Sequence, residues 1–149
     1  MPKKAKTSKK AELEGKTPVS DKVKSEKPKT MKRILIVEDE RPLSHALELK
    51  LANCGYETKV VETGTDAVKE MKDGSYAVFL LDIIIPEMDG FAVLKELSKS
   101  KIKTPIIILS NLGQEEDKER AKTLGVKEYC VKANTPLAEI VDIVKKYAK

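Results

Sequence analysis

The 149-residue sequence lacks several features that mark common protein classes. No apolar run reaches the length of a membrane-spanning helix, and no apolar signal-peptide core follows the basic start. Neither a GxGxxG turn nor a Walker lysine motif is present, so the sequence gives no support to a nucleotide-binding site of those kinds. We therefore expect a cytoplasmic chain without a membrane association.

Reactive side chains are also scarce, because the chain has two cysteines and one histidine. Cys54 falls on the apolar side of an expected helix, and Cys130 lies within the last expected strand. This placement predicts two buried thiols rather than a disulfide. His45 lies off the apolar stripe of its helix, and we expect it to be a solvated surface residue.

Positive charge is concentrated at one end of the chain. Residues 1–30 contain ten lysines and four acidic residues, whereas residues 31–149 hold 19 basic and 20 acidic side chains. The first segment has no aromatic residue and few apolar ones, so it cannot bury enough surface to offset its ordering entropy. We predict a disordered lysine-rich tail over residues 1–30, which either only aids solubility, the favoured interpretation, or makes weak contact with polyanions. Residues 31–149 are expected to form a single folded domain whose near-neutral charge disfavours broad nucleic-acid binding.

Four short apolar runs dominate residues 31–149. They lie at residues 34–37, 78–81, 106–109 and 129–131, and they are rich in β-branched side chains without polar alternation. Such runs are typical of strands that are buried on both faces of a parallel sheet. A further strand is expected near residues 56–61, after the first helix.

Helical patterns separate the strands. The first helix is expected to have Pro42 in its first turn and to stop at Gly55, and Thr135 with Pro136 is expected to cap and open the last helix. The helix within residues 113–124 offers only Ala121 and Leu124 as clear core contacts, so it is the helix that shifts most easily. The alternation predicts an α/β fold, a doubly wound five-stranded parallel sheet.

Five polar residues end or directly follow different apolar runs. They are Glu38, Asp39, Asp82, Ser110 and Lys132. In open parallel sheets, ligands bind beyond the carboxyl ends of the strands, where the strand order reverses. Three acids, a hydroxyl and a lysine at that edge predict a site for a metal ion and a phosphoryl group. A carboxylate can attack phosphorus to form an acyl phosphate, and Mg²⁺ prefers oxygen ligands.

These motifs resemble the receiver domain of two-component response regulators, in particular stand-alone receivers of the chemotaxis-regulator kind. The matching segments are residues 37–40 (VEDE), 81–90 (LDIIIPEMDG), 108–110 (ILS) and 129–132 (YCVK). They span the folded segment in the family's order and spacing. The resemblance implies a flavodoxin-like fold with strand order 2-1-3-4-5.

The resemblance also implies a role for each site residue. Asp82 would be the phosphoacceptor, Lys132 would pair with the phosphoryl group, and the Ser110 hydroxyl would bond to it. Ser110 and Tyr129 would form the switch that responds to phosphorylation.

Magnesium would be held by the same edge of the sheet. The resemblance implies Asp39 as a direct ligand, Glu38 as a ligand through water, and Asp82 and the backbone carbonyl of Ile84 as further ligands. Taken singly, the residues have plainer readings: Glu38 and Asp39 as solvated turn acids, Lys132 as a surface lysine and Tyr129 as a core aromatic.

Two departures from the family pattern affect the expectations. Ala133 stands where proline usually follows the lysine, often after a cis peptide bond, so the sequence leaves the bond open between cis and trans. Ile84 and Leu112 occupy the two positions that tune phosphate lifetime, and both are apolar. We therefore expect a long-lived phosphorylated state, with minutes to hours favoured over seconds.

The expected function is that of a single-domain response regulator that takes a phosphoryl group on Asp82 from a histidine kinase or phosphotransfer protein. It would not be an enzyme beyond Mg²⁺-dependent self-phosphorylation and slow autodephosphorylation. The alternative is a degenerate receiver that acts as an unphosphorylated interaction scaffold. A phosphatase of the haloacid dehalogenase type is disfavoured, because it needs a second aspartate where Ile84 stands. The output partner is unknown, and both a monomer and a phosphorylation-dependent dimer fit the sequence.

Overall fold

A five-stranded parallel sheet forms the centre of the molecule. The computed structural model describes residues 31–149, of which Lys32–Lys149 form one compact unit. The sheet has the order β2-β1-β3-β4-β5. Its strands are β1 (Arg33–Val37), β2 (Glu57–Val61), β3 (Val78–Leu81), β4 (Ile106–Ser110) and β5 (Glu128–Val131). The predicted α/β fold with the flavodoxin-like strand order is confirmed.

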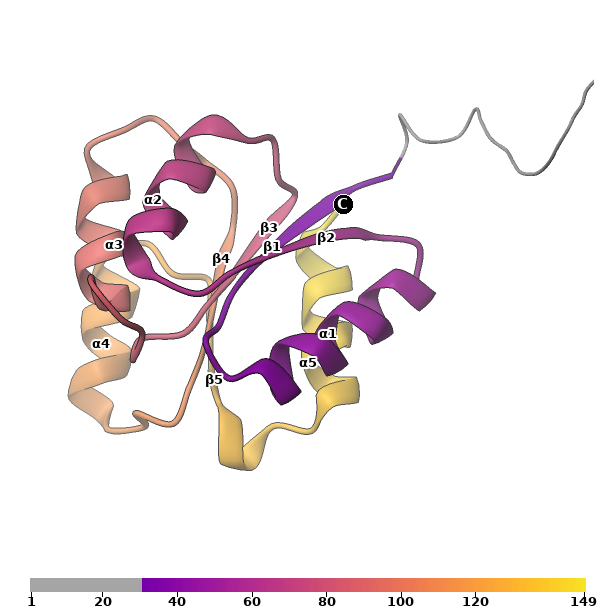
Figure 1. Cartoon of the computed structure of the whole chain (residues 1–149). Helices are drawn as coiled ribbons and strands as arrows, with labels where there is room; N and C mark the ends of the chain where they lie inside the picture. Colours follow the sequence, from indigo (N-terminus) through magenta and orange to yellow (C-terminus); the bar gives the residue numbers. More distant parts are fainter. Residues whose placement is uncertain (1–30) are drawn as a thin grey trace, which may run out of the picture. The chain divides into compact units, whose positions relative to one another are not determined.

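Helices cover both faces of this sheet (Figure 1). One face carries α1 (Arg41–Asn53) and α5 (Leu137–Tyr147), and the other carries α2 (Gly64–Asp73), α3 (Gly90–Ser98) and α4 (Glu115–Thr123). Successive residues of one strand therefore enter different cores: Ile34 packs in the cluster with α1 and α5, whereas Leu35 packs in the cluster with α2 and α3. A central strand with a core on each face needs an apolar side chain at every position, which explains the missing polar alternation.

Burial falls from the centre of the sheet to its edges. Every residue of β3 and β4 is buried, while the edge strands β2 and β5 are partly exposed. The site residues that follow β1, β3 and β4 are therefore carried by the most rigidly packed strands of the domain.

The ends of α1 agree with the prediction from the sequence, but the start of α5 differs from it. Pro42 lies in the first turn of α1, and Gly55 follows the helix with φ 90° and donates its N–H to the carbonyl of Ala52. At α5, Pro136 takes the cap position, and the Thr135 hydroxyl donates to the Val131 carbonyl at 2.8 Å. The predicted Thr135 cap is wrong, because this hydroxyl closes the turn behind β5 instead.

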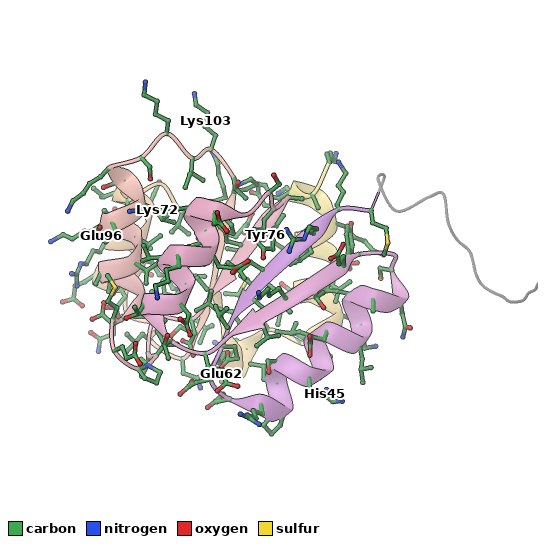
Figure 2. The ribbon with its side chains drawn as sticks, turned by 45° about the horizontal axis from the view of Figure 1, so that its top comes forward. His45, Glu62, Lys72, Tyr76, Glu96 and Lys103 are labelled. Atoms are coloured by element: carbon green, nitrogen blue, oxygen red, sulfur yellow. The ribbon has the colours of Figure 1, made fainter. Side chains whose placement is uncertain are left out.

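The prediction of two buried thiols is half wrong. Cys130 is buried, but Cys54 is exposed. Helix α1 ends at Asn53, so Cys54 lies beyond the last helical turn and the helical period no longer sets its direction. His45 is exposed on the outer side of α1, as expected (Figure 2).

Helix α4 has the weak packing that its sequence predicts. Ala121 is its one buried residue, whereas α3 buries Gly90, Phe91, Val93, Leu94 and Leu97. A second attachment comes from Arg120, whose guanidinium carbon lies 4.1 Å from the centre of the Phe91 ring. Helix α4 is thus held by buried Ala121, by the cation–π contact to α3, and by its C-cap Leu124, which is partly buried against the same core.

The tail predicted over residues 1–30, with its polyanion contact, lies outside the described residues, and the domain boundary after it stays a prediction. No helix formed by residues 31–149 combines the length and the apolar character that a membrane crossing requires.

Candidate functional site

The carboxyl ends of four strands place the predicted residues around one pocket. Glu38 and Asp39 follow β1, Asp82 follows β3, Ser110 ends β4 and Lys132 follows β5. The pocket has a volume of about 200 Å³, and its lining residues are Asp39, Glu40, Asp82, Ile84, Ser110, Asn111 and Lys132. The strands are parallel, and β1 and β3 are neighbours near the centre of the sheet. The acids that follow them, Glu38, Asp39 and Asp82, therefore meet at the centre of this edge.

Three carboxylates converge at the pocket, which Asp39 and Asp82 line and beside which Glu38 is buried. Glu38, Asp39 and Asp82 each offer an oxygen, and these atoms lie within 4.8 Å of one another. Glu38 is 2 % exposed and Asp82 is 4 % exposed, while Asp39 is open to solvent. Charges of one sign at this distance repel one another, and a divalent cation relieves that repulsion. A few carboxylates beside open space for water fit Mg²⁺, which prefers oxygen ligands and keeps part of its hydration shell.

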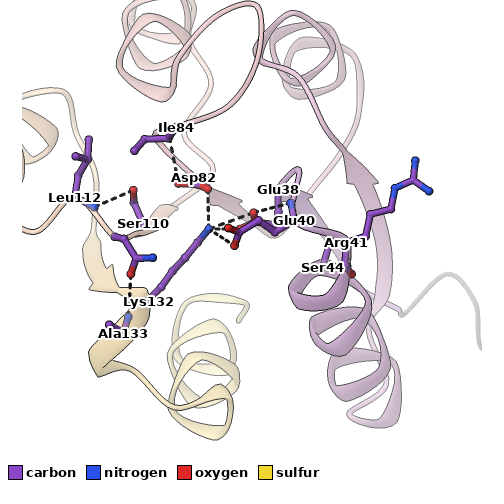
Figure 3. A network of polar contacts seen from close by, with 11 residues as sticks. Glu38, Glu40, Arg41, Ser44, Asp82, Ile84, Ser110, Leu112, Lys132 and Ala133 are labelled. Carbon is purple, nitrogen blue, oxygen red and sulfur yellow. Dashed lines mark hydrogen bonds and ion pairs between the residues drawn. The ribbon is translucent and has the colours of Figure 1, made fainter.

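The Lys132 side chain extends from the end of β5 across the site and contacts the acids that follow β1 and β3 (Figure 3). Its Nζ lies 2.8 Å from Asp82 Oδ2, 2.9 Å from Glu38 Oε1 and 3.1 Å from Glu40 Oε1. Burial lowers the pKa of the ammonium, but hydrogen bonds and the charges of Asp82 and Glu38 outweigh burial and raise the pKa above its ordinary value. Lys132 is therefore a fixed cation.

Glu40 is a site residue that the sequence did not single out. It is the N-cap of α1, and its side chain is exposed, yet it pairs with Lys132. Its backbone N–H also donates to Glu38 Oε2 at 3.0 Å. Burial raises the pKa of Glu38, and this backbone hydrogen bond opposes the rise. The signal available in the sequence was a third acid in succession after β1.

Asp82 is held by a partner at each oxygen. Oδ2 faces Lys132, and Oδ1 accepts the backbone N–H of Ile84 at 3.2 Å. The loop after Asp82 folds closely because Gly90 donates its N–H to the Ile83 carbonyl at 2.8 Å. A Cβ at Gly90 would lie 2.7 Å from the backbone oxygen of Asp82, so any larger residue would displace the loop that carries the acid.

Ser110 and Tyr129 are joined through Leu112. The Leu112 N–H donates to Ser110 Oγ at 3.3 Å, and the Tyr129 hydroxyl donates to the Leu112 carbonyl. Ser110 is fully buried. Burial, with smaller contributions from the charges of Asp117 and Asp82, raises the pKa of Tyr129 to about 12. The two predicted switch residues thus form one hydrogen-bonded chain from the pocket towards α4.

The sequence left the Lys132–Ala133 peptide bond, in the loop after β5, open between cis and trans. Lys132–Asn134 forms a short 3₁₀ turn, and the Lys132–Ala133 peptide bond is trans. The N–H of Ala133 donates to Asn111 Oδ1 at 3.1 Å. Asn111 is a second site residue that the sequence did not single out. The presence of an N–H at Ala133, where proline has none, was the one available signal.

The arrangement suits phosphoryl chemistry. A buried carboxylate with a cation at one oxygen lies beside two more acids that can hold a metal ion, and a hydroxyl lines the other side of the pocket. Lys132, together with a metal ion that these acids could hold, would offset the negative charge of an incoming phosphate group, and such electrostatic stabilisation is a main part of phosphoryl transfer.

A family model and a curated relative match the sequence of this chain. The sequence model of the response regulator receiver domain matches residues 34–145. A curated relative, the transcriptional regulatory protein DltR of Streptococcus agalactiae, is 36% identical over 100 residues, which are 67% of this chain and 45% of the relative. The chain therefore spans less than half the length of that relative.

Solved structures share the fold. The receiver domain of Francisella response regulator 1452 has a TM-score of 0.74 at 28% identity and covers 78% of this chain and 96% of that chain. The receiver domain of sensor histidine kinase PA1611 from Pseudomonas aeruginosa has a TM-score of 0.71 at 26% identity and covers 80% of this chain and 98% of that chain. That structure has a magnesium ion coordinated in its active site cleft.

Proposed function

The chain belongs to the response regulator receiver family, and from this premise we propose that it takes a phosphoryl group on Asp82 from a histidine kinase or phosphotransfer protein. The observation that carries the proposal is the position of Asp82. It is buried at the end of β3, lies 2.8 Å from Lys132 Nζ and shares the pocket with two further acids. Receiver domains are signalling modules rather than enzymes, and we assign this chain the same role.

Transfer requires one carboxylate oxygen of Asp82 to bond to phosphorus as the bond between phosphorus and the donor breaks. With a phosphohistidine donor, the leaving imidazole nitrogen regains its lone pair, and the product is an aspartyl phosphate. The carboxylate is ready for attack because Lys132 and the Ile84 N–H fix its orientation. Lys132 then balances charge on the phosphoryl oxygens, and the Ser110 hydroxyl donates to one of them.

Magnesium belongs to the proposal, since receiver domains bind it at an acidic site and the Pseudomonas receiver holds one in its cleft. Asp39 and Asp82 would hold the ion directly, Glu38 through water, and the Ile84 carbonyl would complete the protein ligands. When bound, the ion supplies positive charge to the phosphate oxygens. The converging oxygens of Glu38, Asp39 and Asp82 support this assignment.

The signal to a partner protein would follow from a change in the series of hydrogen bonds that joins Ser110, Leu112 and Tyr129. A Ser110 that turns towards the phosphoryl group pulls on Leu112, whose carbonyl holds the Tyr129 hydroxyl. Helix α4 follows Leu112 and has one buried residue, so a shift costs little packing energy. We propose that phosphorylation moves Tyr129 inward and alters the surface formed by α4, β5 and α5.

Asp82→Asn tests the phosphoacceptor assignment. Wild type incubated with acetyl phosphate and Mg²⁺ should carry one label that resists acid but is released by alkali and hydroxylamine. The label should be absent from Asp82→Asn and present in Asp142→Asn, which changes an exposed aspartate of α5. Labelling of Asp82→Asn at the wild-type level would disprove the assignment.

The same assay separates the alternative function. A degenerate receiver that serves only as an interaction scaffold would show no label in wild type. Beryllofluoride with Mg²⁺ gives a second measurement, because it mimics the aspartyl phosphate. Chemical-shift changes that reach α4 and Tyr129 support the proposed switch, whereas changes confined to the loop around Asp82 disprove it.

A further inference from the structure

Asn111 joins the two loops that flank the pocket. It directly follows Ser110 at the end of β4 and lines the pocket together with Asp82 and Lys132. Its Oδ1 accepts the N–H of Ala133, the residue next to Lys132, at 3.1 Å. One side chain therefore connects the loop after the hydroxyl residue with the loop after the lysine.

The loop after Lys132 needs such a restraint. Proline at position 133 would restrict the backbone by its ring, whereas alanine leaves φ free. The turn is held from one side by Thr135, whose hydroxyl donates to the Val131 carbonyl at 2.8 Å and whose N–H donates to the Lys132 carbonyl at 3.4 Å. On the other side, the side-chain oxygen of Asn111 accepts the N–H of Ala133.

The two loops also pack closely at a second point. A Cβ on Gly113 would lie 3.1 Å from Val131 Cγ2, so the loop after β4 runs against the end of β5. The hydrogen bond from Ala133 to Asn111 thus fixes the direction of the chain at the place where Lys132 leaves β5. Lys132 must span the end of β4 to reach Asp82, so its reach depends on that direction.

We propose that Asn111 is a positioning residue that holds the Lys132 loop in place for phosphoryl transfer to Asp82. The inference rests on the proposed function, because Lys132 serves that reaction. Asn111 acts through the backbone of Ala133, takes the place of the restraint that a proline would give, and couples the Ser110 loop to the lysine. Neither the metal ligands nor the acids contribute to this contact.

The first test measures the contact itself by amide hydrogen exchange in the full chain. Asn111→Ala removes the acceptor, while Asn111→Asp keeps an oxygen at the same position. The Ala133 amide should exchange about threefold to tenfold faster in Asn111→Ala, the range expected for one exposed hydrogen bond, and at close to the wild-type rate in Asn111→Asp. Equal Ala133 exchange in wild type and Asn111→Ala would overturn the inference.

The second test measures the reaction with acetyl phosphate and Mg²⁺. Asn111→Ala should lower the phosphorylation rate about threefold to tenfold while changing the Mg²⁺ dissociation constant less than twofold, since Asp39 and Asp82 are untouched. Asn134→Ala, at an exposed asparagine of the same turn, is the matched control and should leave both quantities unchanged. A loss of Mg²⁺ affinity equal to the loss of rate would indicate general disruption of the site and overturn the positioning role.

A double-variant comparison identifies the route of the effect. Ala133→Pro has no N–H to donate, so adding Asn111→Ala to it should change the rate less than twofold. Adding Asn111→Ala to Lys132→Ala should likewise have no further effect. A full Asn111→Ala loss in either background would overturn the inference. No labelling in wild type would overturn the proposed function and this inference with it, whereas normal labelling in Asn111→Ala overturns the inference alone.

Discussion

Lys132 and Asp82 form an ion pair of 2.8 Å that reaches from the end of β5, past β4, to the end of β3. The same ammonium lies 2.9 Å from Glu38 Oε1 beyond β1. One lysine thus links the carboxyl ends of three strands, and it neutralises part of the negative charge that the pocket would otherwise carry. Lys132 and a divalent cation consequently compete for the same carboxylates.

Removing this ammonium should strengthen Mg²⁺ binding. In Lys132→Met, the dissociation constant for Mg²⁺ should fall roughly tenfold, the factor that about 1.4 kcal/mol of relieved repulsion gives. Without Mg²⁺ the variant should unfold more easily than wild type, because Glu38 and Asp82 remain as buried carboxylates without a cation. Calorimetric titration and thermal unfolding check the two effects, with exposed Lys145→Met as the control. Unchanged Mg²⁺ affinity would contradict the competition.

The strand pattern and the family motifs together place the main site residues. Asp82 follows a run of four residues that are all buried, as expected for a central strand with an apolar core on each face. Once the runs are strands of one parallel sheet, their carboxyl ends share an edge, so Glu38, Ser110 and Lys132 must approach Asp82. The fold and the composition of the pocket therefore follow from apolar periodicity together with the family motifs.

The missed residues depend on loop directions that periodicity does not encode. Glu40 belongs to the site because its side chain turns back from the start of α1, although it is exposed. Asn111 belongs to it because two loops from separate strands meet there. Cys54 was misplaced because the helical period was extended one residue past the end of α1. Each error lies at an element end, where local geometry replaces the repeat.

Tyr129 should make stability fall at alkaline pH. Burial raises its pKa to about 12, whereas an unfolded tyrosine titrates near pH 10. Between about pH 10 and 12 the unfolded chain releases this proton and the folded chain keeps it, so the free energy of unfolding decreases as the pH rises. In Tyr129→Phe the free energy of unfolding should lose this contribution to its decrease with pH. Urea unfolding from pH 9 to 11.5 measures it, and identical slopes in both proteins would contradict the assignment.

The two thiols should react at different rates. Cys54 is exposed, while burial, aided by the charges of Glu128 and Glu139, raises the pKa of Cys130 to about 11. A thiol reagent such as Ellman's reagent at pH 8 should modify one thiol per chain at once and the second only after denaturant is added. Cys54→Ser should abolish the fast phase. A fast phase that persists in this variant would show that Cys130 is accessible.

Arg120 should limit the mobility of α4. Its guanidinium lies over the Phe91 ring, and the helix has one buried residue besides. Arg120→Ala should lower the free energy of unfolding by about 0.5–1 kcal/mol and speed amide exchange in α4 more than in α3. Lys122→Ala, at an exposed position of the same helix, is the control. An equal increase in exchange across α3 and α4 would show that the contact stabilises the domain as a whole.

The phosphorylated state should last for minutes to hours. Hydrolysis needs a water molecule aligned opposite the Asp82 oxygen, and a polar side chain at the pocket mouth helps to orient that water. Ile84 lies at this mouth, where it is 59% exposed, and Leu112 is partly buried with both its N–H and its carbonyl already bonded. Neither side chain can hold a water. Neither position therefore supplies a polar group that could orient the attacking water.

Polar replacements at these two positions should shorten that lifetime. Ile84→Asn should speed loss of the phosphoryl group roughly threefold to tenfold, and the double variant with Leu112→Glu should speed it further, because each adds a hydrogen-bonding group where water must align. Ile84→Val keeps an apolar side chain and should leave the rate within twofold of wild type. Release of phosphate after removal of the donor gives the rate. A wild-type half-life of seconds, or a double variant as slow as wild type, would show that backbone geometry rather than apolar shielding sets the lifetime.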